Sequence, residues 1–168
     1  MVILSFSMSV VFSYSSSLAL DHADVLTAFL ILFAFIFIGI LFDIIGISAT
    51  SCDEKSFHSM AARRVVGAKE GIWLLKNAEK VASICNDVVG DICGIISGAT
   101  GAAISAMLIR STTLHPVIVP LVITGLIASL TIGGKALGKT VAIRRGRDVV
   151  YITAKAIHFI KSIFGRGV

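Results

Sequence analysis

The stretch SICNDVVGDICGIISGATGAA, Ser83 to Ala103, decides the fold, because it is apolar enough for a membrane yet carries three strongly polar side chains. These are Asn86, Asp87 and Asp91, and a helix would stack the two carboxylates one turn apart on one face. Ionised groups at membrane depth are costly and usually mark an ion path or a buried charge pair. The stretch therefore predicts a membrane helix with one polar site. The alternative is that both carboxylates lie near the membrane surface, in the first turns of the helix.

A second face of the same predicted helix carries almost no side-chain bulk. Small residues recur every four positions in two apolar segments: Gly90, Gly94 and Gly98 in the first, and Gly125, Ser129 and Gly133 in the second. Small residues at this spacing let two helix backbones approach closely in lipid. We therefore expect these two faces to pack against each other.

The composition indicates an integral membrane protein, because 56% of the residues are hydrophobic and only 15% are charged. With 168 residues, the chain has room for one domain of three to four membrane spans. The net charge of +5 is interpreted as the positive-inside bias of membrane proteins, not as a nucleic-acid interface. The three cysteines have no CxxC spacing, which favours small buried residues over a disulfide or a metal set.

The predicted fold is an all-α integral membrane protein with three core transmembrane helices and an additional N-terminal one. A cytoplasmic amphipathic helical hairpin and a basic amphipathic C-terminal helix complete it. Apolar stretches of about 20 residues, the length that crosses a bilayer, define the spans. The segments of this single membrane domain, 1–168, are a short or truncated first span at 1–20, spans at 25–48, 83–109 and 116–134, the hairpin at 51–80 and the basic tail at 135–168.

The hairpin and the tail hold most of the cations, six and eight respectively, whereas the segment between the last two spans holds only Arg110. Since cytoplasmic segments are enriched in Lys and Arg, we expect a multi-pass protein of the cell membrane with a cytoplasmic C-terminus. Within the hairpin, Ser51 and Glu54 fit a capping box, Gly67 separates two helices, and Trp73 suits an interfacial anchor.

Two motifs suggest a family. The hairpin ends in LLKNAE, Leu74 to Glu79, and the last span ends in GKALGKTVA, Gly134 to Ala142. The order of segments, from Phe42 to about Val150, resembles the transmembrane domain of the CorB/CNNM magnesium transporter family. That family has an LLxNPE-like turn and a G-E-x-x-P-K-T-x-A motif at these two places. This chain has Lys135 and Gly138 where the family has Glu and Pro, and no counterpart of the family's CBS domains.

The resemblance implies transport of a divalent cation, with Mg²⁺ as the one cofactor that it suggests. Oxygen ligands for such an ion are available on two of the predicted spans: Asp43, Asn86, Asp87 and Asp91. Lys135 is the competing ligand, since its ammonium group would neutralise the acidic cluster. The alternative function is therefore a non-transporting structural or regulatory membrane protein, in which an Asp–Lys cluster holds helices together.

Enzymatic activity is not expected, because no nucleophile–base pair and no zinc-ligand spacing is evident. The segment Gly133 to Thr140, GGKALGKT, matches the phosphate-binding P-loop pattern. It follows a membrane span instead of a strand and has no second acid for magnesium, so nucleotide binding is not expected either. The lipid bilayer is the expected partner, a homodimer is left open, and no nucleic acid is expected.

Overall fold

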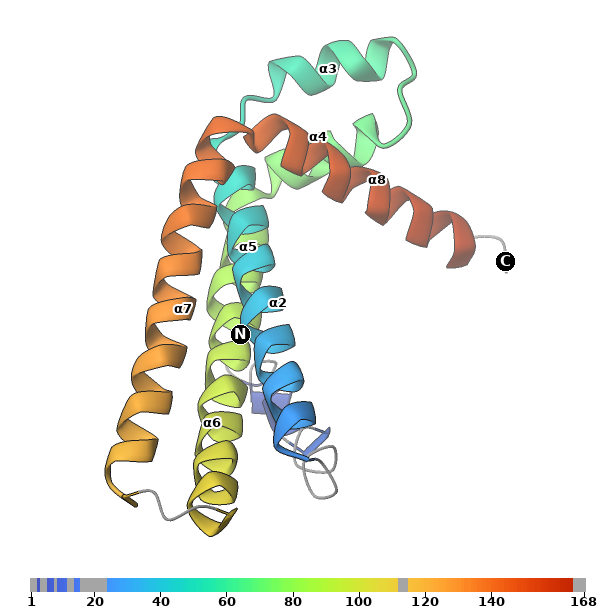
Figure 1. Ribbon diagram of the computed structural model, residues 1–168. Coiled ribbons are helices and arrows are strands. Elements are labelled where there is room, and N and C mark those ends of the chain that lie inside the picture. Colours follow the sequence, from blue (N-terminus) through green and yellow to red (C-terminus); the bar gives the residue numbers. More distant parts are fainter. Residues whose placement is uncertain are drawn as a thin grey trace. The chain divides into compact units, whose positions relative to one another are not determined.

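The computed structural model describes residues 24–111 and 115–164, together with 3, 6–7, 9–11 and 14–15. Every regular element in these residues is helical, which confirms the all-α class (Figure 1). The elements are α2 (Val25–Ser51), α3 (Lys55–Ala62), α4 (Ala68–Lys76), α5 (Ala78–Ser83), the π-helical segment η1 (Ile84–Gly90), α6 (Asp91–Ser111), α7 (Ile118–Arg144) and α8 (Gly146–Phe164). Most of the predicted first span at 1–20 lies outside the described residues.

Three of the described helices are long and apolar enough to cross a membrane: Val25–Ser51, Ala78–Ser111 and Ile118–Arg144. They contain the predicted spans at 25–48 and 83–109 and nearly all of the span at 116–134. The helices have 27, 34 and 27 residues, more than the roughly 20 residues that a bilayer requires. Pro120 does not interrupt the third helix, because it lies in the first turn, where its missing N–H group has no intrahelical partner to lose.

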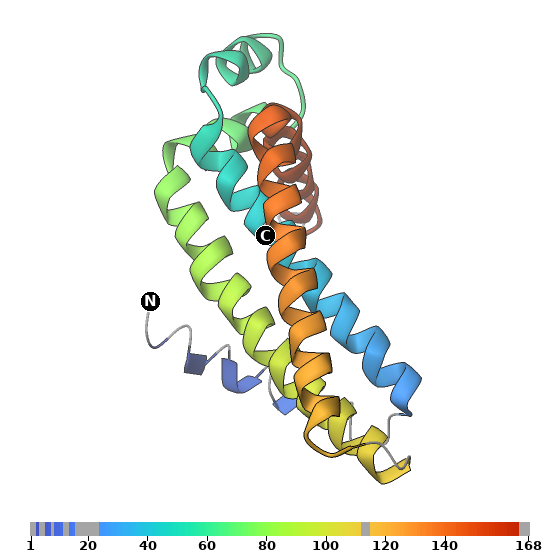
Figure 2. The same ribbon diagram turned by 60° about the vertical axis from the view of Figure 1, so that its left-hand side comes forward.

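The chain divides into two compact units. Unit 1 comprises Met1–Leu41 and Val88–Ala136. In it, the first part of α2, α6 and most of α7 run side by side (Figure 2). Small and branched apolar side chains fill the space between these helices: Ala28, Leu32, Ile36, Ile104, Val119 and Ile123. Large apolar side chains also cover the outside, including Leu26 at 72% and Leu121 at 67% exposure, as expected for helices whose solvent is lipid.

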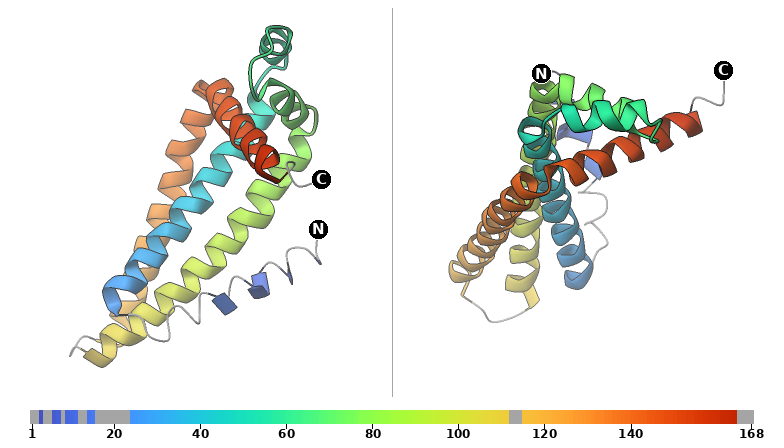
Figure 3. Two further views of the ribbon diagram at one scale, coloured as in Figure 1. Left: turned by 90° about the vertical axis from the view of Figure 1, so that its right-hand side faces the viewer. Right: turned by 90° about the horizontal axis from the view of Figure 1, so that it is seen from above.

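Unit 2 comprises Phe42–Asp87 and Leu137–Val168. In it, α4 and α8 lie side by side, and α3 packs on α4 (Figure 3). Their shared core consists of Phe57, Leu74, Leu75, Val150 and Ala154. A Cβ atom added to Gly71 would overlap the ring of Phe57, so glycine is what lets α3 lie close to α4.

The turn between α3 and α4 confirms the prediction that Gly67 separates two helices. Gly67 has a φ of +85° and lies against the backbone of Lys155 in α8, so a side chain there would be both strained and crowded. The predicted capping box, by contrast, is wrong. Ser51 ends α2, α3 begins at Lys55, and the backbone N–H of Lys55 donates to Asp53 Oδ1 over 3.0 Å. Glu54 is the N-cap residue of α3 without a side-chain capping bond, and Asp53 before it accepts the first N–H of the helix in an Asx-type turn.

Candidate functional site

The polar part of the predicted site lies on a distorted helix. Residues Ile84–Gly90 form a π-helical segment between α5 and α6, and it contains both Asn86 and Asp87. Such segments are rare and often accompany functional sites, because the wider turn changes where side chains point. Asp87 is exposed and accepts a hydrogen bond of 2.9 Å from Ser83 Oγ, one turn earlier on the same helix.

Asn86 points at the neighbouring helix α2. A Cβ atom added to Gly46 would overlap its amide oxygen, so the absence of a side chain at Gly46 is what admits Asn86. Within the part of the chain that the structure describes, Asn86 Oδ1 is buried and has no hydrogen-bond partner. A buried, unpaired polar atom costs about 1–3 kcal/mol and is uncommon unless a water, an ion or a ligand satisfies it. Asn86 Oδ1 and Thr100 Oγ1 are the two such atoms among the described residues, and Asn86 is the one that belongs to the predicted ligand set.

Asp43 lies on α2 close along the chain to this helix contact. It precedes Gly46 by three residues on α2, so the two positions share the face of the helix on which Asn86 packs. Asp43 is half-buried. Asp43 and Asn86 both belong to unit 2, and Asp43 lies about one helical turn along α2 from the glycine against which Asn86 packs.

Asp87 also belongs to unit 2, whereas Asp91 and Lys135 belong to unit 1, where Asp91 is exposed and Lys135 is half-buried. Among the residues that the structure describes, no group of three or more His, Cys, Asp or Glu side chains could hold a metal ion. Of the predicted ligands, Asn86 is the one that the structure packs against a neighbouring helix, at Gly46 of α2. The shared magnesium site of Asp43, Asn86, Asp87 and Asp91 stays a prediction.

The predicted contact between the two glycine faces is not made within unit 1. Gly94, Gly98, Gly125 and Gly133 are exposed, and a Cβ atom added to any of them would meet nothing within 4 Å; of the predicted set, only Gly90 is buried. Other glycines make the close contacts of this unit: Gly39 against Cys93, Gly101 against Ile127, and Gly134 against Ile40. Each of these glycines leaves room for one side chain of a neighbouring helix, either an isoleucine or a cysteine. The four-residue spacing of glycines in the sequence does not predict these contacts.

Two further sequence features have a clear structural outcome. The P-loop-like segment Gly133 to Thr140 lies entirely within the continuous helix α7, so its backbone N–H groups do not form a phosphate-binding loop. Cys85 and Cys93 are buried, Cys52 is half-buried, and all three are free thiols.

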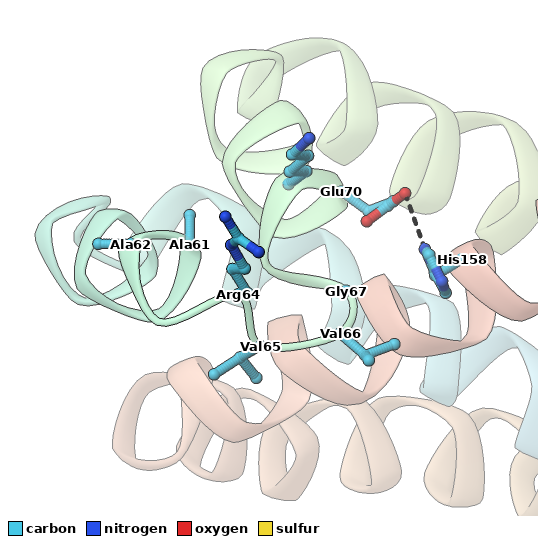
Figure 4. A pocket seen from close by; sticks show the side chains of 9 residues that line it. Ala61, Ala62, Arg64, Val65, Val66, Gly67, Glu70 and His158 are labelled. Atoms are coloured by element: carbon cyan, nitrogen blue, oxygen red, sulfur yellow. Dashed lines mark hydrogen bonds and ion pairs between the residues drawn. The ribbon is translucent and has the colours of Figure 1, made fainter.

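A pocket in unit 2, lined by both apolar and charged side chains, was not anticipated from the sequence. It has a volume of about 660 Å³ and is lined by residues of the end of α3, the α3–α4 turn, the start of α4 and α8 (Figure 4). Inside it, His158 Nδ1 and Glu70 Oε1 are 3.1 Å apart. Burial raises the pKa of Glu70, but the hydrogen bond and charge of His158, with Lys161 nearby, outweigh this effect and hold that pKa below its usual value. The two residues are 88 positions apart, so no local pattern predicts their contact.

Comparisons with protein families, curated proteins and solved structures found no match for this chain. The resemblance to the CorB/CNNM transmembrane domain rests on the two motifs quoted above. In the structure, LLKNAE covers the end of α4 and the start of α5, with the helix interrupted at Asn77, whose side chain donates to the Trp73 carbonyl over 2.9 Å. The second motif, from Gly134, is helical throughout.

Proposed function

We propose that this protein is a multi-pass membrane protein that binds a divalent cation, with Mg²⁺ as the expected ion, and that it takes part in transport of that ion. The observation that carries the proposal is the buried, unpaired amide oxygen of Asn86 in a π-helical turn, packed on the face of α2 that holds Asp43. Amide and carboxylate oxygens are the ligands that hard divalent cations prefer. Mg²⁺ usually keeps several of its coordinated waters, so one or two protein oxygens are enough to bind it.

The charge pattern supports a position at one end of the membrane helices. The stretches 25–42, 92–109 and 118–134 contain no charged residue, and each has 17 or 18 residues, about 26 Å of helix. That length is close to the hydrocarbon thickness of roughly 30 Å. At the ends of these stretches that lead into unit 2, the first charges are Asp43, Asp91 and Lys135.

The same ends are the cytoplasmic ones in our proposal. Of the 15 Lys and Arg residues, six lie between Phe42 and Asp87 and seven between Leu137 and Val168, so unit 2 holds 13 of them. This excess is what the positive-inside rule associates with the cytoplasmic face. The cation would then enter from, or leave to, the cytoplasm, and the exposed carboxylates of Asp87 and Asp91 would raise its local concentration.

The test is the thermal stability of the purified full-length protein in detergent, with Mg²⁺ or with Na⁺ at matched ionic strength. We expect Mg²⁺ to raise the melting temperature of the wild type, and Asn86→Ala and Asp43→Asn to lose that increase. Asp148→Asn, which removes an exposed carboxylate of α8 in the same unit, is the matched control and should keep it. Equal stabilisation by Na⁺, or an unchanged Mg²⁺ effect in both site variants, would contradict the proposal.

The second candidate is a non-transporting protein in which an Asp–Lys cluster holds helices together. The observation in its favour is that Lys135 is half-buried within a membrane-length helix. If its ammonium group is a structural counter-charge, Lys135→Ala should lower the melting temperature strongly, because buried acids would be left uncompensated. If the acids bind an ion instead, the same variant should keep or strengthen the Mg²⁺ effect.

A further inference from the structure

The C-terminus of α3 closes in a Schellman motif whose key position is occupied by an arginine. The N–H of Val65 donates to the carbonyl of Met60, and the N–H of Arg64 donates to the carbonyl of Ala61. The N···O distance is 3.0 Å in both hydrogen bonds. Arg64 has a φ of +54° and is the one non-glycine residue with positive φ in the described backbone. Glycine is usual at this position, because a side chain there costs about 1–2 kcal/mol. An arginine at this position therefore needs another reason.

The reason that the structure offers is the pocket between α3, α4 and α8, which Arg64 lines (Figure 4). Lys69 and Glu70, in the first turn of α4, and His158 of α8 line it as well. The Glu70 carboxylate is engaged by His158. In the described part of the chain, neither the Arg64 guanidinium nor the Lys69 ammonium forms an ion pair. Within the described residues, the pocket thus has two exposed cations, Arg64 and Lys69, that form no ion pair.

An apolar hollow of about 340 Å³ adjoins this pocket, because Val66 and His158 line both. Its other walls come from Ile152, Ala156 and Phe159 of α8, with the stem of Lys155. Ile152 and Phe159 are each 66% exposed and Val66 is 54% exposed. A ligand that fits both hollows has an anionic head and an apolar body.

We propose that this composite site binds an anionic phospholipid, with its phosphate at Arg64 and Lys69 and its glycerol and upper acyl chain over Val66, Ile152 and Phe159. Arginine holds a phosphate bidentately, and basic amphipathic segments next to membrane helices are where anionic lipids bind. Continuity with three membrane-length helices keeps unit 2 near the bilayer surface, where such lipids are abundant. This site is separate from Asn86 and Asp43, so either proposal can fail alone.

The first experiment measures binding to the purified full-length protein in zwitterionic detergent, as the shift of its melting temperature during titration. The ligands are dioctanoyl phosphatidylglycerol, dioctanoyl phosphatidylcholine and inorganic phosphate. We expect stabilisation by phosphatidylglycerol alone, and at least tenfold weaker binding by the Arg64→Gln, Lys69→Gln double variant. The double variant Lys76→Gln, Lys80→Gln removes the same charge from exposed positions outside the pocket and should bind like the wild type. Equal effects of the two lipids, equal effects of inorganic phosphate, or equal losses in both double variants would overturn the proposal.

The second experiment uses Arg64→Gly, which separates folding from binding. Glycine relieves the left-handed conformation, so the melting temperature without lipid should stay equal or rise. Binding of phosphatidylglycerol should nevertheless weaken, and Arg64→Lys should restore part of it. A lower melting temperature together with unchanged lipid binding would make Arg64 a structural residue and contradict the proposal.

Discussion

The helices of unit 1 and unit 2 differ in composition and in how they bury their apolar side chains. In unit 1, α6 and the first part of α2 carry apolar side chains on every face, and many of the largest point outward. In unit 2, α4 and α8 are amphipathic and pack part of their apolar side chains around a core that contains Phe57 and Val150, while Ile152 and Phe159 of α8 stay exposed. Helices in lipid gain little from burying apolar area, so the close fit of their surfaces decides how they pack. Where helices face water, the burial of apolar side chains in a core decides their packing.

The largest effect is expected from Phe57→Ala in unit 2. Phe57 is fully buried and is the one buried residue of α3, so its loss should cost about 3–5 kcal/mol. Hydrogen–deuterium exchange of the purified protein should show faster exchange of the α3 and α4 amides, with α6 unchanged. Met60→Ala, at the edge of the same core, is the milder control. Equally faster exchange in α6 would mean that the two units do not differ in how they unfold.

A matched pair of glycine variants tests close fit in unit 1. A Cβ atom at Gly101 would overlap Ile127, whereas one at Gly94 meets nothing within 4 Å. Gly101→Leu should therefore destabilise by roughly 1–3 kcal/mol, and Gly94→Leu by less than about 0.5 kcal/mol. Denaturation of the detergent-solubilised protein by increasing sodium dodecyl sulfate measures both. A larger loss for Gly94→Leu would show that another chain covers the open glycine face.

The sequence was enough to predict the fold class and the three membrane-length helices. Runs such as 25–42 are long, apolar and free of charge, which is the pattern of a helix that crosses a bilayer. The break at Gly67 was also predictable, because glycine adopts the positive φ that this turn requires more easily than other residues. Glycine packing was not predictable. A four-residue spacing shows that Gly94 and Gly98 share a face, but whether a partner such as Ile127 faces them or faces Gly101 depends on the rotation of each helix.

The candidate site was predictable only in part. Asn86 and Asp43 stand out in the sequence because polar groups are rare in apolar segments, and the structure packs Asn86 against Gly46, three residues after Asp43 on α2. The π-helical turn around Asn86 has no recognisable sequence signal. The pocket at Arg64 and His158 combines segments that are distant along the chain, and the left-handed conformation of Arg64 follows from the Schellman hydrogen bonds, not from a residue preference.

A smaller effect, on pH dependence, is expected from Glu70→Gln in unit 2. The lowered pKa of Glu70 means that its ionised form stabilises the fold above the ordinary pKa of about 4.5, and that this contribution is lost as the pH falls through the lowered value. The contribution should not exceed about 1 kcal/mol, because His158 is half-exposed. Melting temperatures between pH 7 and pH 3 should fall less steeply in Glu70→Gln than in the wild type. Asp148→Gln is the control, and a slope equal to that of the wild type in Glu70→Gln would exclude this role.

The smallest effect is expected from Ser83→Ala, which asks where water ends and lipid begins along the helix Ala78–Ser111. Ser83 donates to Asp87, the last residue of unit 2 on this helix. If Asp87 faces water, the carboxylate exchanges one hydrogen bond for another, and stability should change by less than about 0.5 kcal/mol. If Asp87 faces lipid, the lost donor is not replaced, and the cost should exceed 1 kcal/mol, roughly that of an unsatisfied buried group. Detergent denaturation of Ser83→Ala, beside the conservative Ser83→Thr, distinguishes the two. The first outcome would place the membrane boundary beyond Asp87, in agreement with the charge-free stretch that begins at Ile92.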